Sequence, residues 1–421
     1  MTLRNRELAA LLTVGLLTAM GFATVYIALK SQISSGSLGY ALFFFGLYLV
    51  AHVVARVTVP LADPYLLPMA ALLTAIGLTE IYRLGPASNA FRQGLWVVIG
   101  VGVFAATLFW LRHDYRVLER YKYIFGVTAI LLLFLPLTPG LGEQINGSRL
   151  WIHVGSLQFQ PGELGKIALI VFLAGYLREK REVLAQGRLK DWGPLLVIWG
   201  GAMLVLLATD DLGSALLYYG IFLAMLYIAT ARLSFVAAAL GLFLVGAFAI
   251  TRVTPHVQER VNIWLNPYPH SQTTGYQILQ SLYSIAHGGV GGTGLGRGIL
   301  NTPTGQPIVP DQNTDFIYSA LAQELGLIGA AAILLLYMAF VLRGFQVAMT
   351  ATDGFSKLLA AGLSFGFAFQ TFVIVGGITR VIPLTGITLP FVSYGGSSVV
   401  ANFLLVAGLM LVSNRANRET A

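Results

Sequence analysis

The feature that most constrains this chain is a series of apolar windows, each about as long as a membrane-spanning helix. A transmembrane helix needs about 20 consecutive, mostly apolar residues, and such windows recur along the sequence. Inside lipid, a helix satisfies its own backbone hydrogen bonds, whereas irregular segments do not. We therefore expect a helical membrane protein whose spans are residues 8–29, 37–55, 66–82, 93–111, 123–138, 162–177, 194–208, 212–230, 233–250, 315–342, 358–378 and 389–412.

Composition supports this class of protein. Hydrophobic residues make up 56% of the chain and charged residues only 10%, with a mean hydropathy of +0.75. A soluble globular domain carries about 25% charged residues, so that class is excluded. We predict an all-α polytopic membrane protein with about 12 transmembrane helices and a large extracytoplasmic loop.

The placement of Lys and Arg predicts the orientation of these helices. With a cytoplasmic N-terminus, about two thirds of the 26 Lys and Arg residues fall in inner segments, as the positive-inside rule requires. Both termini are then expected in the cytoplasm, and the two longest loops, 139–161 and 251–314, on the outer side. The same placement explains the net charge of +8, so we predict no nucleic-acid partner.

The longer outer loop ends in the most informative stretch, residues 288–324. It is rich in glycine, contains proline and meets an apolar segment at Asp315. A loop of this kind cannot lie in lipid because its backbone groups would lack partners. An ionisable side chain at the membrane boundary is by default a functional candidate. We predict Asp315 as the catalytic residue; the alternative is that it only caps the following helix.

The shorter outer loop supplies five candidates for substrate binding. Arg149 and Trp151 offer a cation and a flat apolar surface that suit a sugar or a phosphate-bearing headgroup, or else anchor the loop at the interface. Gln160 precedes a helix in which Glu163 and Lys166 lie three residues apart and share a face. This pair is either functional or a structural ion pair between helices.

Three more candidates for substrate binding lie further along the chain. Asp211 opens a helix, where it either caps the N-terminus or contacts substrate. Two short amphipathic helices are expected at 256–265 and 274–286. Gln277 and Ser281 are four residues apart and share one face of the second helix.

Glycines follow this second helix at a familiar spacing. Gly289, Gly291 and Gly294 match G-x-G-x-x-G. No strand is expected before them, so a dinucleotide-binding fold is not indicated. We expect these glycines to allow close approach of the backbone to a bulky ligand.

The last outer segment adds four candidates for substrate binding, which are Arg380, Ser393, Tyr394 and Ser397. In LPFVSYGGSS, small and polar residues interrupt the start of the final span. This pattern is typical of a broken helix that lines a cavity, or of close helix packing through small residues. We include all four residues among the candidates for substrate binding.

Seven motifs together resemble one family. NGSRLW, FQPGELGK, DDLGSALL, GYQILQS, GGVGGTGLGRG, TDFIYSALAQELG and LPFVSYGGSS occur in the order and spacing of the SEDS family (shape, elongation, division and sporulation), over residues 66–413. Two positions depart from the family pattern. Gly162 stands where members often have Ser, and Asn313 where they often have His, while Glu163, Lys166 and Asp315 are retained.

The resemblance implies an architecture and an activity. It implies a ten-helix SEDS core in residues 61–421, preceded by two additional helices in residues 1–60. The implied protein is a peptidoglycan glycosyltransferase of the bacterial cytoplasmic membrane, which polymerises lipid II into glycan strands on the outer face for elongation or division. The implied partner is a class B penicillin-binding protein, a transpeptidase, alongside membrane lipids.

The chemistry of such a reaction fits the candidate residues. Joining sugars from a lipid pyrophosphate donor needs a base for the acceptor hydroxyl and positive charge at the pyrophosphate, and a single displacement inverts the anomeric centre. Asp315 would be the base, with Arg149, Lys166 and Arg380 nearby. The six histidines show no ligand spacing, so we predict no protein-built metal site, and expect Mg²⁺ or Mn²⁺ to bind with the substrate pyrophosphate.

The alternative function is a flippase or transporter of lipid-linked precursors. Many spans, a broken helix and intramembrane charges also describe that class. The polar candidates cluster on the expected outer side, however, and do not form a series through the membrane midplane. Glycosyltransferase is therefore the predicted function.

Overall fold

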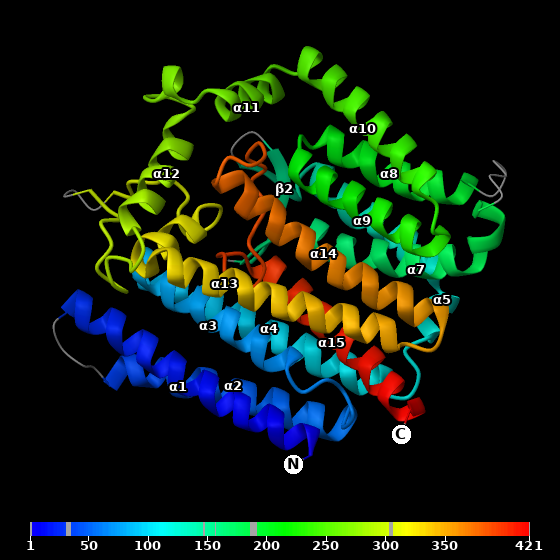
Figure 1. Cartoon of the computed structure of the whole chain (residues 1–421), viewed down its shortest axis with the longest axis horizontal. Coiled ribbons are helices and arrows are strands. Elements are labelled where there is room, and N and C mark those ends of the chain that lie inside the picture. Colours follow the sequence, from blue (N-terminus) through cyan, green and yellow to red (C-terminus); the bar gives the residue numbers. More distant parts are fainter. Residues whose placement is uncertain are drawn as a thin grey trace.

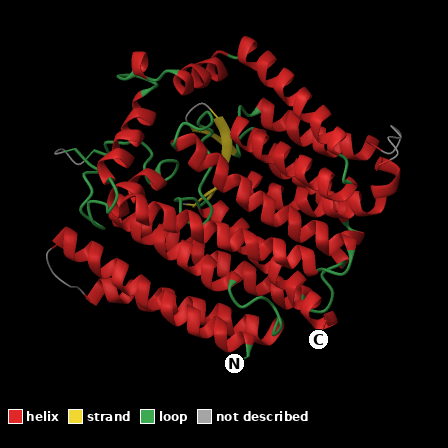
Figure 2. Ribbon diagram, in the orientation of Figure 1, coloured by secondary structure: helices red, strands yellow, loops and turns green. Residues whose placement is uncertain are grey.

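The computed structural model describes residues 2–30, 35–145, 148–155, 157–185, 192–302 and 306–420. It is a helical bundle with one small sheet (Figures 1 and 2). The elements in chain order are α1 (Leu3–Lys30), α2 (Ser35–Thr58), α3 (Leu66–Leu84), α4 (Ala87–Leu111), α5 (Val117–Arg120), α6 (Lys122–Phe134), η1 (Leu135–Leu137), β1 (Gly142–Ile145), β2 (Ser148–Val154), β3 (Leu157–Phe159), α7 (Pro161–Ala185), α8 (Gly193–Ala208), α9 (Leu212–Thr230), α10 (Leu233–Val253), α11 (Pro255–Leu265), η3 (Tyr268–His270), α12 (Tyr276–Gly288), α13 (Ile317–Thr350), α14 (Gly354–Ile378) and α15 (Gly396–Thr420).

Each expected span corresponds to a helix of this bundle. Within the described residues, nine helices are long and apolar enough to cross a membrane. Of the rest, α6 and α8 are shorter apolar helices, and α7 carries charged residues towards both ends. The protein is thus an all-α polytopic membrane protein, as predicted, while the number of spans stays a prediction.

The core of the bundle is built around α15. This helix packs against α4, α7, α13 and α14, and most of its apolar residues are buried. The two N-terminal helices, α1 and α2, pack together and against α3 and α4 on one flank (Figure 1). The division into residues 1–60 and 61–421 stays a prediction.

Both chain termini lie at one end of the bundle. Arg4 of α1 and Asn417 of α15 both donate hydrogen bonds to backbone carbonyls of the α2–α3 connection, at Ala62 and Leu61 respectively. The short helices α11 and α12 and the small sheet lie towards the other end (Figure 1). The two predicted amphipathic helices at 256–265 and 274–286 are therefore confirmed as α11 and α12.

The helix α13 is broken near its start. Gly326 has φ 66° and ψ −171°, outside the helical region. Residues 317–325 therefore form a short, buried helix that is separate from the long helix after the break. This corrects the expected continuous span at 315–342: Asp315 precedes a short helix, and only the residues after Gly326 form the membrane-length segment.

The glycine-rich loop is fitted around this break. A Cβ on Gly292 would lie 2.2 Å from the carbonyl oxygen of Glu324, so only glycine fits there. The backbone N–H of Gly294 donates to the same carbonyl oxygen at 2.9 Å, and that of Leu327 donates to the Gly289 carbonyl at 2.9 Å. The loop thus approaches the broken helix closely, because the freed backbone groups of that helix need partners. The expected approach of the glycines to a ligand stays a prediction.

A three-stranded antiparallel sheet, in the order β1-β2-β3, follows η1. The sequence analysis expected only a loop there, although Trp151, Ile152 and Val154 are residue types that favour strands. Ile152 pairs with Phe159 in the β2–β3 ladder. The sheet brings β2 next to the start of α7 and forms one wall of a cavity.

Candidate active site

A cavity of about 1280 Å³ opens at the end of the bundle that carries α11, α12 and the sheet. Its walls come from β2, the starts of α7 and α9, α11, α12, and the irregular segments that precede α13 and α15. Of the predicted site residues, eight line it: Trp151, Gln160, Glu163, Asp211, Gln277, Asp315, Arg380 and Tyr394. Segments far apart in the sequence therefore converge on one space.

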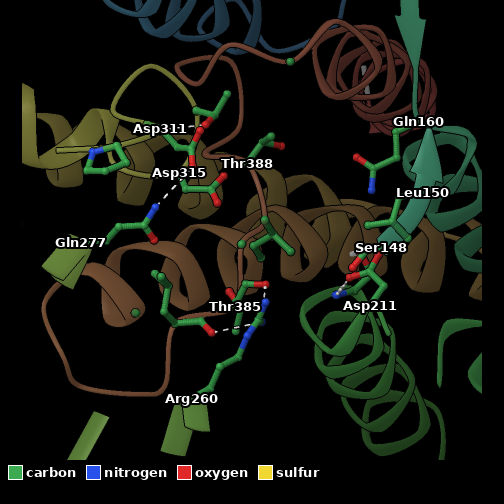
Figure 3. Close-up of a pocket in the computed structure, with 18 of the residues that line it drawn as sticks. Ser148, Leu150, Gln160, Asp211, Arg260, Gln277, Asp311, Asp315, Thr385 and Thr388 are labelled. Carbon is green, nitrogen blue, oxygen red and sulfur yellow. Dashed lines mark hydrogen bonds between the residues drawn. The ribbon is translucent and has the colours of Figure 1, made fainter. Parts of the chain in front are cut away.

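Asp315 lies in a tight turn at the base of this cavity. Asp311 begins the turn with a left-handed φ of 55°, and its carbonyl oxygen accepts hydrogen bonds from the backbone N–H groups of Thr314 and Phe316 at 3.1 and 3.3 Å. Gln277 of α12 approaches the Asp311 carboxylate at 3.4 Å (Figure 3). The turn fixes the direction in which Asp315 leaves the backbone.

The Asp315 carboxylate is held without a partner. Its side chain is half-buried, and no described residue donates a hydrogen bond to it. The N-cap of α13 is Phe316, which makes no side-chain cap bond, so Asp315 does not cap this helix. Burial away from bulk water, with the negative Asp311 nearby, raises the pKa of Asp315 to about 7, against the opposing effect of Arg260.

Arg260 of α11 is a site residue that the sequence analysis did not single out. It lines the cavity and interacts electrostatically with both Asp211 and Asp315. Its Nη1 makes only long contacts, 3.4 and 3.5 Å, with the carbonyl oxygens of Leu384 and Thr385, so donors of its guanidinium stay available (Figure 3). Burial lowers the pKa of Arg260, but a guanidinium remains charged at neutral pH. The sequence did contain a signal for Arg260, because it is a cation on a predicted short amphipathic helix of the outer loop.

A second group of polar residues lines the part of the cavity next to β2 and α9. Asp211 caps α9, because its carboxylate accepts from the backbone N–H of Ser214 at 2.9 Å. It also lines the cavity, and burial raises its pKa. Of the two interpretations that the sequence left open, the helix cap is confirmed, and contact with substrate stays a prediction. Gln160 and Ser148 line the same cavity (Figure 3).

The predicted pairing of Glu163 and Lys166 is present, at 2.8 Å. Lys166 is buried, does not line the cavity, and also donates to the Oε1 of Gln370 of α14 at 2.6 Å. Gln370 in turn donates to the carbonyl of Thr388 at 2.9 Å. Glu163 faces the cavity, so the pair connects the cavity wall to the segment that precedes α15.

Two of the predicted serines hold the site together from outside the cavity. The Oγ of Ser393 donates to the carbonyl of Thr314 at 2.5 Å, beside Asp315. The Oγ of Ser397 accepts from the backbone N–H of Gln160 at 2.6 Å. These bonds connect the LPFVSYGGSS segment to the turn that carries Asp315 and to the cavity wall at Gln160. The helix α15 begins only at Gly396, so the expected interruption of the last span is present.

The remaining candidates differ in their access to the cavity. The guanidinium of Arg380 lines it but donates three hydrogen bonds of 2.9 to 3.1 Å to the carbonyls of Trp264 and Leu265, at the end of α11. Arg149 is exposed on β2 and does not line the cavity. Ser281 is buried in α12, and its hydroxyl has no partner among the described residues. Of the three predicted cations, Arg149 and Lys166 do not line the cavity. Arg380 does, and its Nη1 has no partner among the described residues, so Arg380 and Arg260 both offer donors there.

The described part of the chain contains no group of three or more His, Cys, Asp or Glu side chains arranged to hold a metal ion. Asp311 and Asp315 offer two carboxylates on the wall that precedes α13. A divalent ion needs six or more oxygen ligands, so this wall does not build a metal site by itself.

Comparison with known proteins agrees with this geometry. The family model described as "Cell cycle protein", of FtsW, RodA and SpoVE, matches residues 55–418. The chain is 40% identical to peptidoglycan glycosyltransferase RodA of Mycobacterium tuberculosis, covering 99% of this chain and 92% of that protein. It is 35% identical to stage V sporulation protein E of Bacillus subtilis, covering 85% of this chain and 98% of that protein.

Solved structures show the same arrangement of helices. One, described as "Structural coordination of polymerization and crosslinking by a peptidoglycan synthase complex", superposes with a TM-score of 0.68 at 29% identity, over 85% of this chain and 98% of that chain. Rod shape determining protein RodA of Thermus thermophilus superposes with a TM-score of 0.60 at 27% identity, over 84% and 96%. Fold and site thus define a polytopic membrane protein with a polar cavity at one end. The chain belongs to the FtsW, RodA and SpoVE family, which is the SEDS family that its motifs predicted.

Proposed function

We infer that this chain is a peptidoglycan glycosyltransferase, an enzyme of cell-wall synthesis. Relatives with that name align with nearly the whole chain. The substrate that we propose is lipid II, polymerised into glycan strands. The observation that carries this proposal is Asp315, a carboxylate without a hydrogen-bond donor among the described residues, with a pKa of about 7, in a cavity shared with the buried cation Arg260.

The proposed reaction assigns one step to each of these groups. Asp315 takes the proton of the acceptor sugar hydroxyl as its oxygen forms a bond to the anomeric carbon of the donor. The bond from that carbon to the pyrophosphate breaks, and the electron pair leaves with the lipid pyrophosphate. A pKa near 7 suits this role, because the carboxylate is ionised at neutral pH and yet basic enough to accept a proton. The single displacement inverts the anomeric centre.

The pyrophosphate requires positive charge, and Arg260 supplies it. A guanidinium presents donors in a planar fork that matches phosphate oxygens. Arg149 and Arg380 are less suited, since the first is exposed away from the cavity and the second is bonded to backbone carbonyls. A Mg²⁺ or Mn²⁺ ion would be held mainly by the pyrophosphate and water, because the described cavity wall lacks a ligand set. No step of the proposed reaction requires that ion.

The location that we propose is the bacterial cytoplasmic membrane, with both termini in the cytoplasm and the cavity open to the outside. Support comes from the Lys and Arg distribution and from the termini lying together at the end opposite α11 and α12. The chain has no cysteine, so single substitutions can report this directly. Tyr268→Cys, in the outer loop, should react with a membrane-impermeant thiol reagent on intact cells, and Thr2→Cys only after permeabilisation. The reverse pattern would contradict the placement.

The partner that we propose is a class B penicillin-binding protein, with surrounding lipids covering the apolar helix faces. Support comes from the structure described as a peptidoglycan synthase complex of polymerization and crosslinking, to which this chain is similar. Such a partner would crosslink the strands that this chain polymerises.

The deciding experiment offers lipid II to the purified full chain, with and without a class B penicillin-binding protein. Glycan polymer made by the chain, and not by Asp315→Asn, would support the proposal. The alternative, a flippase, predicts movement of lipid II between the leaflets of vesicles with no polymer. Polymer formation that is unaffected by Asp315→Asn would contradict the assignment of the base.

A further inference from the structure

The N-terminal helices α1 and α2 contact the part of the molecule that carries Asp315. Phe22 of α1, Tyr40 of α2 and Tyr82 of α3 form an aromatic cluster with ring centroids 5.8 to 6.0 Å apart. Such pairs stabilise beyond simple burial of area. The cluster fixes the end of α3, where Arg83 follows Tyr82.

Arg83 forms a clamp on the glycine-rich loop together with Glu324. Its Nε donates to the Glu324 Oε1 at 3.2 Å, and its Nη2 donates to the carbonyl of Gly298 at 3.0 Å. Glu324 also accepts from the backbone N–H groups of Gly296 at 2.6 Å and Gly298 at 3.2 Å. The Glu324 side chain is fully buried, so each of these bonds compensates for the loss of water.

Helix α1 touches this clamp directly at Gly296. This glycine has φ +80°, and a Cβ on it would lie 2.7 Å from the Cβ of Ala28 and 3.3 Å from the Cα of Val25. The loop therefore rests on α1, and a side chain at position 296 would displace one of them. Two separate contacts, through Gly296 and through Tyr82, lead from the N-terminal helices to Glu324.

Glu324 belongs to the short helix of residues 317–325, which begins directly after Asp315. Because the helix is broken at Gly326, the position of this segment is set by its own contacts and not by the long helix that follows. A helix of about two and a half turns transmits a displacement as a rigid body. Moving the clamp therefore moves the backbone on which Asp315 is mounted.

The far end of the N-terminal pair is anchored as well. Arg4 and Glu7 are paired at 2.5 Å, His52 of α2 lies 2.6 Å from the other oxygen of Glu7, and Arg4 donates to the carbonyl of Ala62. All three side chains are buried. The two helices α1 and α2 are thus fixed at this end, so that their other end can support the glycine-rich loop.

We propose that α1 and α2 act as a positioning element for the catalytic carboxylate, through the contact of Ala28 and Val25 with Gly296 and the clamp of Arg83 and Glu324. This proposal rests on the proposed function of Asp315. It gives the N-terminal helices a role in the reaction, although the family model matches only from residue 55. The helices do not touch the substrate cavity, so their residues are positioning and not catalytic residues.

The test is a double-substitution cycle across the contact, in the full chain with its partner protein and lipid II. Gly296→Ala should lower kcat by about tenfold or more, because a displacement near 1 Å of a catalytic group costs up to about a hundredfold. Adding Ala28→Gly removes the clash with the Ala28 Cβ but not the strain of a Cβ at φ +80°. It should therefore recover at least about threefold of this loss, and not all of it. Ala9→Gly, on an exposed part of the same helix, is the matched control and should recover nothing.

The pH profile separates positioning from a general loss of stability. Moving the loop changes the surroundings of Asp315, so the midpoint of the kcat profile, expected at about 7, should shift in Gly296→Ala and return in the double variant. If Gly296→Ala does not fold, Ala28→Leu is compared with Ala9→Leu in the same assays. Equal recovery by Ala9→Gly, an unmoved midpoint, or equal activity of the two Leu variants would overturn the proposal. Inactivity of the unmodified chain would instead count against the proposed function.

Discussion

The two ends of the short helix of residues 317–325 carry carboxylates in opposite states. Asp315, just before the helix, has no donor among the described residues and faces the cavity. Glu324, near its end, is fully buried and accepts from Arg83, Gly296 and Gly298. One apolar segment thus places the proposed base before its start and a structural acid near its end.

The difference between them lies in hydrogen bonding. A carboxylate that accepts several hydrogen bonds is stabilised in its charged form and holds neighbouring segments in place. A carboxylate in a partly dry cavity, without donors, is a stronger base because its charged form is poorly stabilised. Substitutions that remove the charge should therefore affect activity at one end of the helix and folding at the other.

The largest expected effect is that of Asp315→Asn on turnover. Asn keeps the size of the side chain and cannot accept the proton, so kcat should fall by roughly 10²- to 10⁴-fold. The amount of folded protein and its binding to the partner should not change, since Asp315 makes no structural hydrogen bond within the described residues. Near-normal polymerisation by this variant would return the role of base to Asp211, Asp311 or Glu163.

Glu324→Gln should show the opposite behaviour. It leaves the part-buried Arg83 without its ion-pair partner, and it leaves one acceptor oxygen where two bind Arg83 and the N–H groups of Gly296 and Gly298. Breaking a buried pair in this way costs about 3–5 kcal/mol of stability. Thermal unfolding in detergent and the yield of folded protein should both report this loss. Activity per folded molecule should fall far less than in Asp315→Asn. A folded, stable and inactive Glu324→Gln variant would contradict the assignment of Glu324 to stability and of Asp315 to activity.

The pH dependence of turnover should follow Asp315. Below its pKa of about 7 the base is protonated, so kcat should fall about tenfold per pH unit, consistent with a single titrating group. Stability should change in the opposite sense. Because the pKa of Asp315 is higher in the folded chain than in the unfolded chain, the folded state holds the extra proton between about pH 4 and pH 7, and stability decreases as pH rises through this window. Asp315→Asn should lack that decrease; an identical pH dependence of melting in both proteins would show that Asp315 titrates normally.

The smallest of these effects is expected for Glu163→Gln. Glu163 resembles Asp315 in facing the cavity and Glu324 in having an ion-pair partner, at 2.8 Å. Lys166 keeps its bond to Gln370 in the variant, so we expect a moderate loss of stability, about 1–3 kcal/mol. Polymerisation should decrease more than this loss explains if Glu163 contacts substrate. Melting temperature and activity measured on the same preparation distinguish the two contributions.

The sequence alone determined the class, the family and the position of the acid that we propose as the base. Apolar windows of bilayer length dictate helices because lipid offers the backbone no hydrogen-bond partner. An acid that ends a glycine-rich loop, as Asp315 does, then lies just before a helix, although here this is the short helix of residues 317–325 and not the membrane-length segment. These inferences need only local composition and order, and each motif lies where its segment was expected.

Only the tertiary structure decided which polar groups act together. The break at Gly326 depends on backbone bonds to the distant Gly289 loop, so the sequence was interpreted as one continuous span. Arg380 lines the cavity, but its Nε and Nη2 donate to carbonyls at the end of α11, whereas Arg260, which the sequence did not single out, makes only long contacts and interacts electrostatically with Asp315. Hydrogen-bond partners contributed by remote segments determine whether a charged side chain is available for chemistry, and no local pattern in the sequence contains them.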